Sequence, residues 1–411
     1  MAFDWRLSTW GDEVSLEYGK ALRGYQEGKH GYRVFGSNGP IGWTEKPLAE
    51  GPGVILGRKG AYRGVHFSKD PFFVIDTAYY VEPKSEMDKR WLYYAIQYHK
   101  LGEIDDGSPI PSTTRAAVYV RELEVPSTPE QYEIGRVLAS LDDRIEHNRD
   151  LTTNLEAIAR RLFKSWFVDF DPVRAKAAGE KSAILADDIA ALFPDRFVDS
   201  ELGEIPEGWE AAPLSAVVNL DTTSVKPFDE PETEWTHFSI PAFDEGQFPA
   251  FETGEQIASN KYLVKSGSVL VSKLNPTQWR CWRPPSELVS ETSICSTEFM
   301  QFVVPENQRE FLWGLCESGP LRDLVLTTVD GTTGSRQRAK PKDVMRGLFV
   351  MPGGNLACEY SSVVRPLLSR ADACILESRL LYQLRDMLLP RLISGKLRVA
   401  DAETLIEEAI A

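Results

Sequence analysis

Glycine-flanked loops in the first third of the chain carry side chains that can bind nucleic acid. The candidates are Asn38 in Ser37-Asn38-Gly39, then Arg58, Lys59, Tyr62 and Arg63 after Gly57, and Thr114 with Arg115. Arg can pair bidentately with guanine and Asn with adenine, while Lys binds phosphate. These residue types therefore predict contacts to both base edges and the DNA backbone.

A second group of such side chains occurs between residues 273 and 340. Its candidates are Lys273, Asn275, Trp279, Arg280, Arg336, Arg338 and Lys340. A solvated loop is the simpler interpretation of any one of these segments. Their recurrence at equivalent places in two halves of the chain favours nucleic-acid binding instead.

No motif predicts catalysis, so no catalytic residue and no metal ligand are assigned. The chain has no Walker A run, and Gly51-Pro52-Gly53 with Gly57 misses GxGxxG by one residue and predicts a turn. Glu27-Gly28-Lys29 with Asp12 matches a nuclease pattern only weakly. The amino-methyltransferase sequences DPPY and NPPY are absent, and the five His are scattered.

Composition predicts a globular cytoplasmic protein with an acidic surface. The net charge of −15 argues against bulk nucleic-acid binding, but affinity depends on the field at one surface rather than on the sum. The N-terminal residues lack a signal peptide's apolar region, and no apolar run approaches the length of a membrane span. The five Cys form no CxxC pair, which predicts reduced thiols.

Two long helices are predicted to position these loops. Residues 131–170 and 356–394 show apolar side chains in a 4-3 alternation, the pattern of a coiled-coil seam. The predicted seam comprises Leu138, Leu141, Ile145, Asn148, Leu155, Leu162, Leu367 and Leu381. Because a globular segment must leave one helix and return to the other, we expect the two helices to pack antiparallel.

The remaining segments read as two mixed, mostly β globular domains that repeat each other. Gly267–Lys273 matches Gly53–Lys59, and Gly331–Arg336 matches Gly107–Ser112. Strands are expected at 32–35, 53–56, 72–75, 78–81 and 117–120, and a helix around 89–100. The predicted fold is α+β with a pseudo-two-fold repeat. Its parts are domain 1–125, helix 126–170, linker 171–208, domain 209–347, helix 348–397 and tail 398–411.

Several segments resemble the specificity subunit of Type I restriction–modification systems over nearly the whole chain. The similar segments are Arg58–Ala61, Leu141–Asn148, Leu162–Phe170, Glu204–Trp209 and Leu389–Leu397. The resemblance implies two target recognition domains, each reading one half of a split DNA site. It also implies a coiled-coil spacer that docks two methyltransferase subunits, with restriction subunits added outside them.

Catalysis and cofactors would then belong to the partners. The resemblance implies that S-adenosylmethionine, ATP and Mg²⁺ bind partner subunits and that this chain is not an enzyme. Exposed cations on the helices, namely Arg160, Arg161, Lys164, Arg379 and Arg385, are candidates for the docking surface. The alternative is a coiled-coil scaffold that binds proteins and has no role with DNA.

Overall fold

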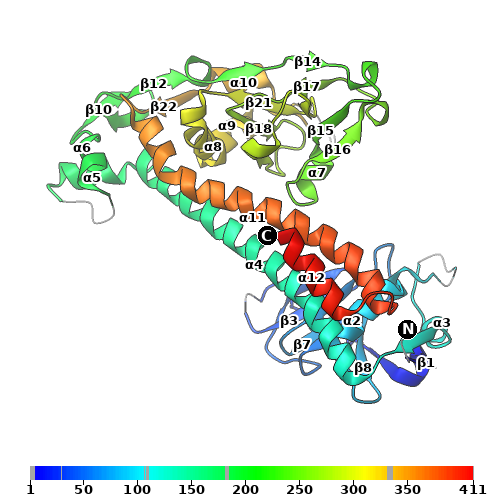
Figure 1. Ribbon diagram of the computed structural model, residues 1–411. Helices are drawn as coiled ribbons and strands as arrows, with labels where there is room; N and C mark the ends of the chain where they lie inside the picture. Colours follow the sequence, from blue (N-terminus) through cyan, green and yellow to red (C-terminus); the bar gives the residue numbers. More distant parts are fainter. Residues whose placement is uncertain are drawn as a thin grey trace. The chain divides into compact units, whose positions relative to one another are not determined.

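The computed structural model describes residues 5–28, 30–105, 107, 111–180, 185–330 and 337–410 (Figure 1). Two compact units are present: residues 1–146 with 380–411, and residues 147–379. The two longest helices, α4 (Thr128–Phe167) and α11 (Leu356–Ile393), each contribute residues to both units. In the described part of the chain, no helix combines the length and the apolar character needed to cross a membrane.

The globular part of the first unit contains two main sheets. A four-stranded antiparallel sheet has the order β2-β8-β5-β6, and a three-stranded sheet has the order β4-β3-β7 with β3 and β7 parallel. A separate β1-β9 pair joins the two ends of this part. The elements are β1 (Arg6–Thr9), α1 (Trp10–Glu13), β2 (Val14–Tyr18), β3 (Tyr32–Gly36), β4 (Gly39–Thr44), β5 (Gly53–Gly57), β6 (Val65–Ser68), β7 (Phe72–Val74), β8 (Ala78–Pro83), α2 (Lys89–Tyr98), α3 (Arg115–Tyr119) and β9 (Glu122–Val125).

The second unit contains a corresponding pair of sheets. Their orders are β13-β21-β18-β19, antiparallel, and β14-β17-β20-β15-β16, with β15 and β20 parallel; β12 and β22 form a separate pair. The elements are α5 (Asp171–Ala177), α6 (Asp187–Ala191), β10 (Phe197–Ser200), β11 (Gly203–Pro206), β12 (Glu210–Pro213), β13 (Asn219–Asp221), β14 (Ser224–Val225), β15 (Glu234–Phe238), α7 (Ile240–Asp244), β16 (Ala250–Thr253), β17 (Lys261–Leu263), β18 (Ser268–Ser272), β19 (Cys281–Trp282), β20 (Ser293–Cys295), β21 (Phe299–Val303), α8 (Arg309–Glu317), α9 (Gly319–Thr327), α10 (Pro341–Arg346) and β22 (Leu348–Met351).

The two globular parts share one strand plan, which confirms the predicted α+β fold and its internal repeat. The order β2-β8-β5-β6 corresponds to β13-β21-β18-β19, and β4-β3-β7 corresponds to β16-β15-β20. In both copies the middle strand of the second sheet pairs antiparallel on one side and parallel on the other. The helices α2 and α8 occupy equivalent places in the two sequences.

The long helices pack antiparallel within each unit, as predicted. In the second unit, Asn148 Nδ2 donates to Glu377 Oε2 at 3.1 Å, and Tyr360 donates to the Ala159 carbonyl at 2.8 Å. In the first unit, Arg385 Nη1 donates to Asp142 Oδ1 at 2.9 Å. Because partners on α11 have falling numbers as those on α4 rise, the two helices run in opposite directions.

Most of the predicted seam is buried, with corrections at three leucines. Leu138, Leu141, Ile145, Asn148 and Leu381 are buried, whereas Leu155 and Leu162 are half-buried. Leu367 is also half-buried, and its neighbour Leu368 takes the fully buried place between Val364 and Ala371. A 4-3 pattern cannot choose between adjacent leucines, so the seam step was placed one residue early.

A strand predicted at 117–120 is wrong, because these residues lie in or beside the short helix α3. Thr114 caps this helix by accepting a hydrogen bond from the Ala117 N–H. The segment 171–208, predicted as a linker, carries α5, α6 and the β10-β11 hairpin, with Val173 and Phe193 in the core of the second unit. The tail contains a helix, α12 (Val399–Ile410).

Candidate nucleic-acid interface

Two cations predicted to bind DNA lie close to the ring of Tyr18, a residue that was not among the predicted site residues. The Arg115 guanidinium lies 4.2 Å from the centre of the Tyr18 ring, and that of Arg58 lies 5.2 Å from it. Tyr18 ends β2 and is 48% exposed. Cations over an aromatic face are attracted by its quadrupole, so the ring helps to hold both guanidinium groups at one place. Arg115 also donates to the Leu16 carbonyl at 2.7 Å and lies 3.7 Å from a Glu17 carboxylate oxygen. We call Tyr18, Arg58 and Arg115 the Tyr18 cluster.

Backbone hydrogen bonds fix Arg58 at the end of the buried strand β5. Its N–H donates to the Thr77 carbonyl at 3.0 Å, and its own carbonyl accepts from Thr113 N at 2.9 Å. The side chain donates to the Asp76 carbonyl oxygen at 2.7 Å, and no ion pair with the Asp76 carboxylate was found. Since one backbone carbonyl leaves the positive charge uncompensated, Arg58 remains suited to binding an anion.

The β3-β4 turn brings Asn38 beside the loop that carries Arg58 and Lys59. Ser37 accepts through its hydroxyl from Lys59 N at 3.3 Å and through its carbonyl from Gly64 N at 2.8 Å. Gly57 permits this approach, because a Cβ there would lie 2.4 Å from the Ser37 carbonyl oxygen. Asn38 and Lys59 are exposed. The predicted amide and cations therefore share one surface of the first unit.

The other candidates in this unit divide into an exposed ring and two structural side chains. Tyr62 is 80% exposed. Arg63 donates to the carbonyls of Gly60, Gly102 and Ile104 at 2.7, 2.8 and 3.0 Å, and Thr114 caps α3. These bonds use the donors of Arg63 to hold the loop, so its role here is to shape the site.

The Tyr79 ring packs against the ring of Tyr18. The two ring centres lie 5.1 Å apart, and the Tyr79 hydroxyl donates to the Thr113 carbonyl at 3.2 Å. Burial, with the hydrogen-bonded neighbour Tyr18, raises the pKa of Tyr79 to about 12. The hydroxyl therefore stays protonated at neutral pH and keeps its bond to the loop.

In the second unit, Lys273 occupies the place of Arg58 rather than that of Lys59. Lys273 N donates to the Glu298 carbonyl and its own carbonyl accepts from Ala339 N, both at 2.9 Å, which repeats the bonds of Arg58. The bridges Lys59–Ser112 and Leu274–Arg338 also correspond. The sequence match was therefore one residue out of step at the end of this strand.

Carboxylates pair with most of the other predicted cations of the second unit. Arg280 is buried and donates to both oxygens of Asp244 at 2.6 and 2.8 Å. Arg338 is bound to Glu298 at 3.0 Å, and Lys340 to Asp330 at 3.1 Å. Arg280 is accordingly structural, whereas the exposed Arg338 and Lys340 could exchange their carboxylates for phosphates.

The remaining candidates of this unit lie near the same loop. Asn275 has a left-handed backbone, with a φ of 48°, and its N–H donates to the Gln337 carbonyl at 3.0 Å. Trp279 is half-buried against the core, with the Arg322 guanidinium 5.9 Å from its ring centre. Arg336 lies outside the described residues.

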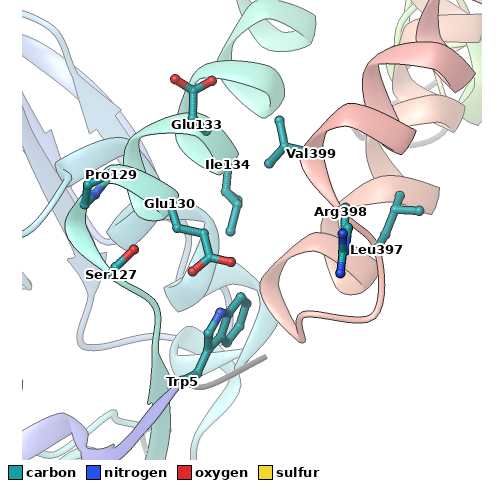
Figure 2. Close-up of a pocket in the computed structure, with 9 residues that line it drawn as sticks. All are labelled: Trp5, Ser127, Pro129, Glu130, Glu133, Ile134, Leu397, Arg398 and Val399. Carbon is teal, nitrogen blue, oxygen red and sulfur yellow. The ribbon is translucent and has the colours of Figure 1, made fainter. Parts of the chain in front are cut away.

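A cavity lies in the first unit, between the start of α4 and the segment joining α11 to α12 (Figure 2). Its volume is about 410 Å³, and its lining comprises Trp5, Ser127, Pro129, Glu130, Glu133, Ile134, Leu397, Arg398 and Val399. This mostly apolar lining contains none of the predicted DNA-binding residues. No cluster of three or more His, Cys, Asp or Glu suited to a metal was found among the described residues.

Comparison with known proteins agrees with this architecture. No family model matches the chain. The Type I restriction enzyme MjaIX specificity subunit of Methanocaldococcus jannaschii is 24% identical over 419 residues, covering 95% of this chain and 88% of the relative. The HindI specificity subunit of Haemophilus influenzae is 26% identical over 356 residues, covering 73% and 74%.

The chain is a homologue of Type I restriction enzyme specificity subunits. The crystal structure of the Type I restriction–modification S subunit from M. genitalium shares the fold, with a TM-score of 0.60 at 15% identity. That likeness covers 95% of this chain and 96% of the other. The α+β plan with two long helices is thus that of a specificity subunit.

Proposed function

We propose that this specificity-subunit homologue selects the DNA sequence on which a Type I complex acts. Residues 1–125 would read one half of a bipartite site in double-stranded DNA, and residues 209–347 the other half. The observation that carries the proposal is the Tyr18 cluster, which gathers two guanidinium groups beside Asn38 and Lys59 at a Gly-shaped surface. Arg and Asn suit base edges, and Lys suits phosphate.

The paired helices would set the distance between the two half-sites and dock two methyltransferase subunits. Arg161 is exposed on α4 and has no ion pair among the described residues, whereas Arg160 is bound to Glu156 and Glu317. Arg161 is therefore the better docking candidate. Reversal of its charge in Arg161→Glu should weaken co-purification with the methyltransferase subunit, and Arg160→Gln serves as the comparison.

Methyl transfer and cleavage would be performed by the partner subunits. S-adenosylmethionine, ATP and Mg²⁺ would accordingly bind to the methyltransferase and restriction subunits rather than to this chain. The chain would act in the cytoplasm as part of that complex. The residues of this chain would then have only DNA-binding and docking roles.

A methylation assay on a library of split sites tests the division into half-sites. In the reconstituted complex, Arg58→Ala should relax or weaken recognition of one half-site, and Lys273→Ala that of the other. Each variant is the control for the other, because the two residues occupy equivalent places. Equal loss at both halves, or no loss at either, would contradict the proposal.

A gel shift separates DNA recognition from the scaffold alternative. Random duplex is titrated with the chain alone and with the chain plus its methyltransferase partner. The proposal predicts a salt-sensitive shift that Arg58→Ala weakens. A complex that forms with the partner but never shifts DNA would favour the scaffold.

A further inference from the structure

A small polar cavity lies in the second unit, beside the start of β18 and the first residue of α8. Its lining comprises Lys265, Ser266, Gly267, Ser268, Ser286, Val289 and Arg309. The volume is about 60 Å³. A cavity needs roughly 10–15 Å³ of such accessible volume to hold one water, so this one has room for water or for one small polyatomic ion.

Two buried polar atoms of this lining have no hydrogen-bond partner. They are Ser268 Oγ, in a residue 2% exposed, and Arg309 Nε, in a residue 4% exposed. The other nitrogens of Arg309 are used: Nη1 donates to Ser286 Oγ at 2.7 Å, and Nη2 donates to the Pro284 carbonyl. Because unpaired buried donors are costly, the two free atoms indicate a missing acceptor in the cavity.

The charges around the cavity favour an anion as that acceptor. Within the described chain, Arg309 has one ion pair, with Glu306 at 3.7 Å from Nη1, and that carboxylate is half-exposed. Burial and the neighbouring Arg283 lower the pKa of the Arg309 guanidinium, so its charge is poorly compensated. Lys265 adds a second, half-buried cation to the lining.

Two of the nearby carboxylates, Asp372 and Glu310, are bound to other arginines, whereas Glu306 is bound at the edge of the cavity. Glu306 accepts a hydrogen bond from Ser266 Oγ at 2.7 Å. Asp372 is bound to Arg283 at 2.6 Å, and Glu310 to Arg365 at 3.0 Å. The exposed Glu287 is a further carboxylate near Asp372, and its negative charge raises the pKa of Asp372. These bonds leave Arg309 Nε and Ser268 Oγ for a further ligand.

We propose that this cavity binds a free tetrahedral oxyanion of the size of inorganic phosphate. Arg309 Nε and Ser268 Oγ would donate to its oxygens, and the Lys265 ammonium would neutralise part of its charge. The site is separate from the candidate DNA contacts, because Lys273 and Asn275 follow the other end of β18. Anion binding in this cavity therefore does not depend on DNA binding by this unit.

Binding would strengthen the junction of three segments. The lining joins the turn before β18, the loop after β19 and the start of α8. A ligand that binds only the folded state raises stability in proportion to the logarithm of its concentration. Phosphate should therefore raise the melting temperature of the protein more than chloride does at equal ionic strength.

The test is isothermal titration calorimetry of the full chain with inorganic phosphate, in a buffer free of phosphate and sulfate. Ser268→Ala should bind phosphate about tenfold more weakly, a change of about 1.4 kcal/mol. Arg309→Gln should lose binding, and if it does not fold, Ser268→Ala carries the test alone. Arg346→Gln is the control, because Arg346 is 79% exposed and lies outside the lining.

Crystals soaked in phosphate provide the second measurement. Density for a tetrahedral ion on Arg309 and Ser268 supports the proposal. Water alone in the cavity, or equal phosphate affinity in Ser268→Ala and the wild type, overturns it. Competition between duplex DNA and phosphate would assign the cavity to a DNA phosphate and would likewise overturn the free-ion proposal.

Discussion

Arg283 and Asp372 form a buried, bidentate ion pair that links the segment after strand β19 to helix α11. Nη1 and Nη2 of Arg283 each lie 2.6 Å from one carboxylate oxygen, and both side chains are under one-tenth exposed. Arg283 Nη2 also donates to the Leu368 carbonyl at 3.1 Å. Burial raises the pKa of Asp372, against the opposing effect of Arg283. The pair therefore anchors the globular part of the second unit on its helix.

Removing one partner of this pair should destabilise the second unit strongly. Asp372→Ala leaves the Arg283 guanidinium buried without its counter-charge, which should cost about 3–5 kcal/mol of unfolding free energy. Urea denaturation followed by circular dichroism measures the change. Arg346→Ala, which removes an exposed pair with Asp343, is the control and should cost less than about 1 kcal/mol. A similar effect of both variants would contradict the anchoring role.

Two adjacent leucines on α11 test the corrected seam. Leu368→Ala should cost about 2–5 kcal/mol, because it empties a fully buried site between the helices. Leu367→Ala should cost clearly less, because Leu367 is half-buried. Denaturation midpoints of the two variants give the comparison. The reverse order would return the seam to the step predicted from the sequence.

Acid should weaken the protein partly through His66. Burial lowers the pKa of His66, so the folded state favours the neutral ring. Stability is then fully present above the unfolded pKa of about 6.5 and is lost as the pH falls toward the lower folded pKa. His66→Gln should reduce the loss of unfolding free energy between pH 7.5 and 5.5. His147→Gln, on an exposed side chain of α4, should leave that loss unchanged.

The helices and the repeat could be predicted because patterns of neighbouring residues in the sequence indicate them. The 4-3 alternation of apolar residues places α4 and α11 within a few residues of their observed bounds. Strands β3, β5, β7 and β8 follow from short apolar runs between turn residues. The segment 117–120 failed because its β-branched and aromatic residues favour a strand, while Thr114 caps a helix there.

The composition of the candidate site depended on contacts that no local pattern encodes. Tyr18 was missed because its partners, Arg58 and Arg115, are 40 and 97 residues away in the chain. The sequence does not reveal that Arg280 is neutralised, because its partner Asp244 is brought to it by the fold. The position of Arg58 directly after a buried strand could be predicted, because a buried strand followed by glycine-rich sequence is itself a local signal.

The Tyr18 ring should matter to DNA binding more than its hydroxyl does. The ring lies against the guanidinium groups of Arg58 and Arg115, which otherwise have the Asp76 and Leu16 carbonyls and Glu17 as partners. Tyr18→Leu should therefore loosen both groups and weaken binding. Tyr18→Phe keeps the ring face and should bind DNA close to the wild type. Fluorescence anisotropy of the full chain on labelled duplex, at several salt concentrations, measures both affinity and salt slope.

The salt slope distinguishes the two ways in which the cluster could act. Loss of one phosphate contact lowers the slope by about one and weakens all sequences evenly. Loss of a guanine contact instead costs about 1–3 kcal/mol and relaxes one position of the site. Arg115→Ala should reproduce part of the Tyr18→Leu effect, since Arg115 lies closest to the ring. Unchanged affinity in Tyr18→Leu, with the fold intact by circular dichroism, would remove the Tyr18 cluster from the DNA interface.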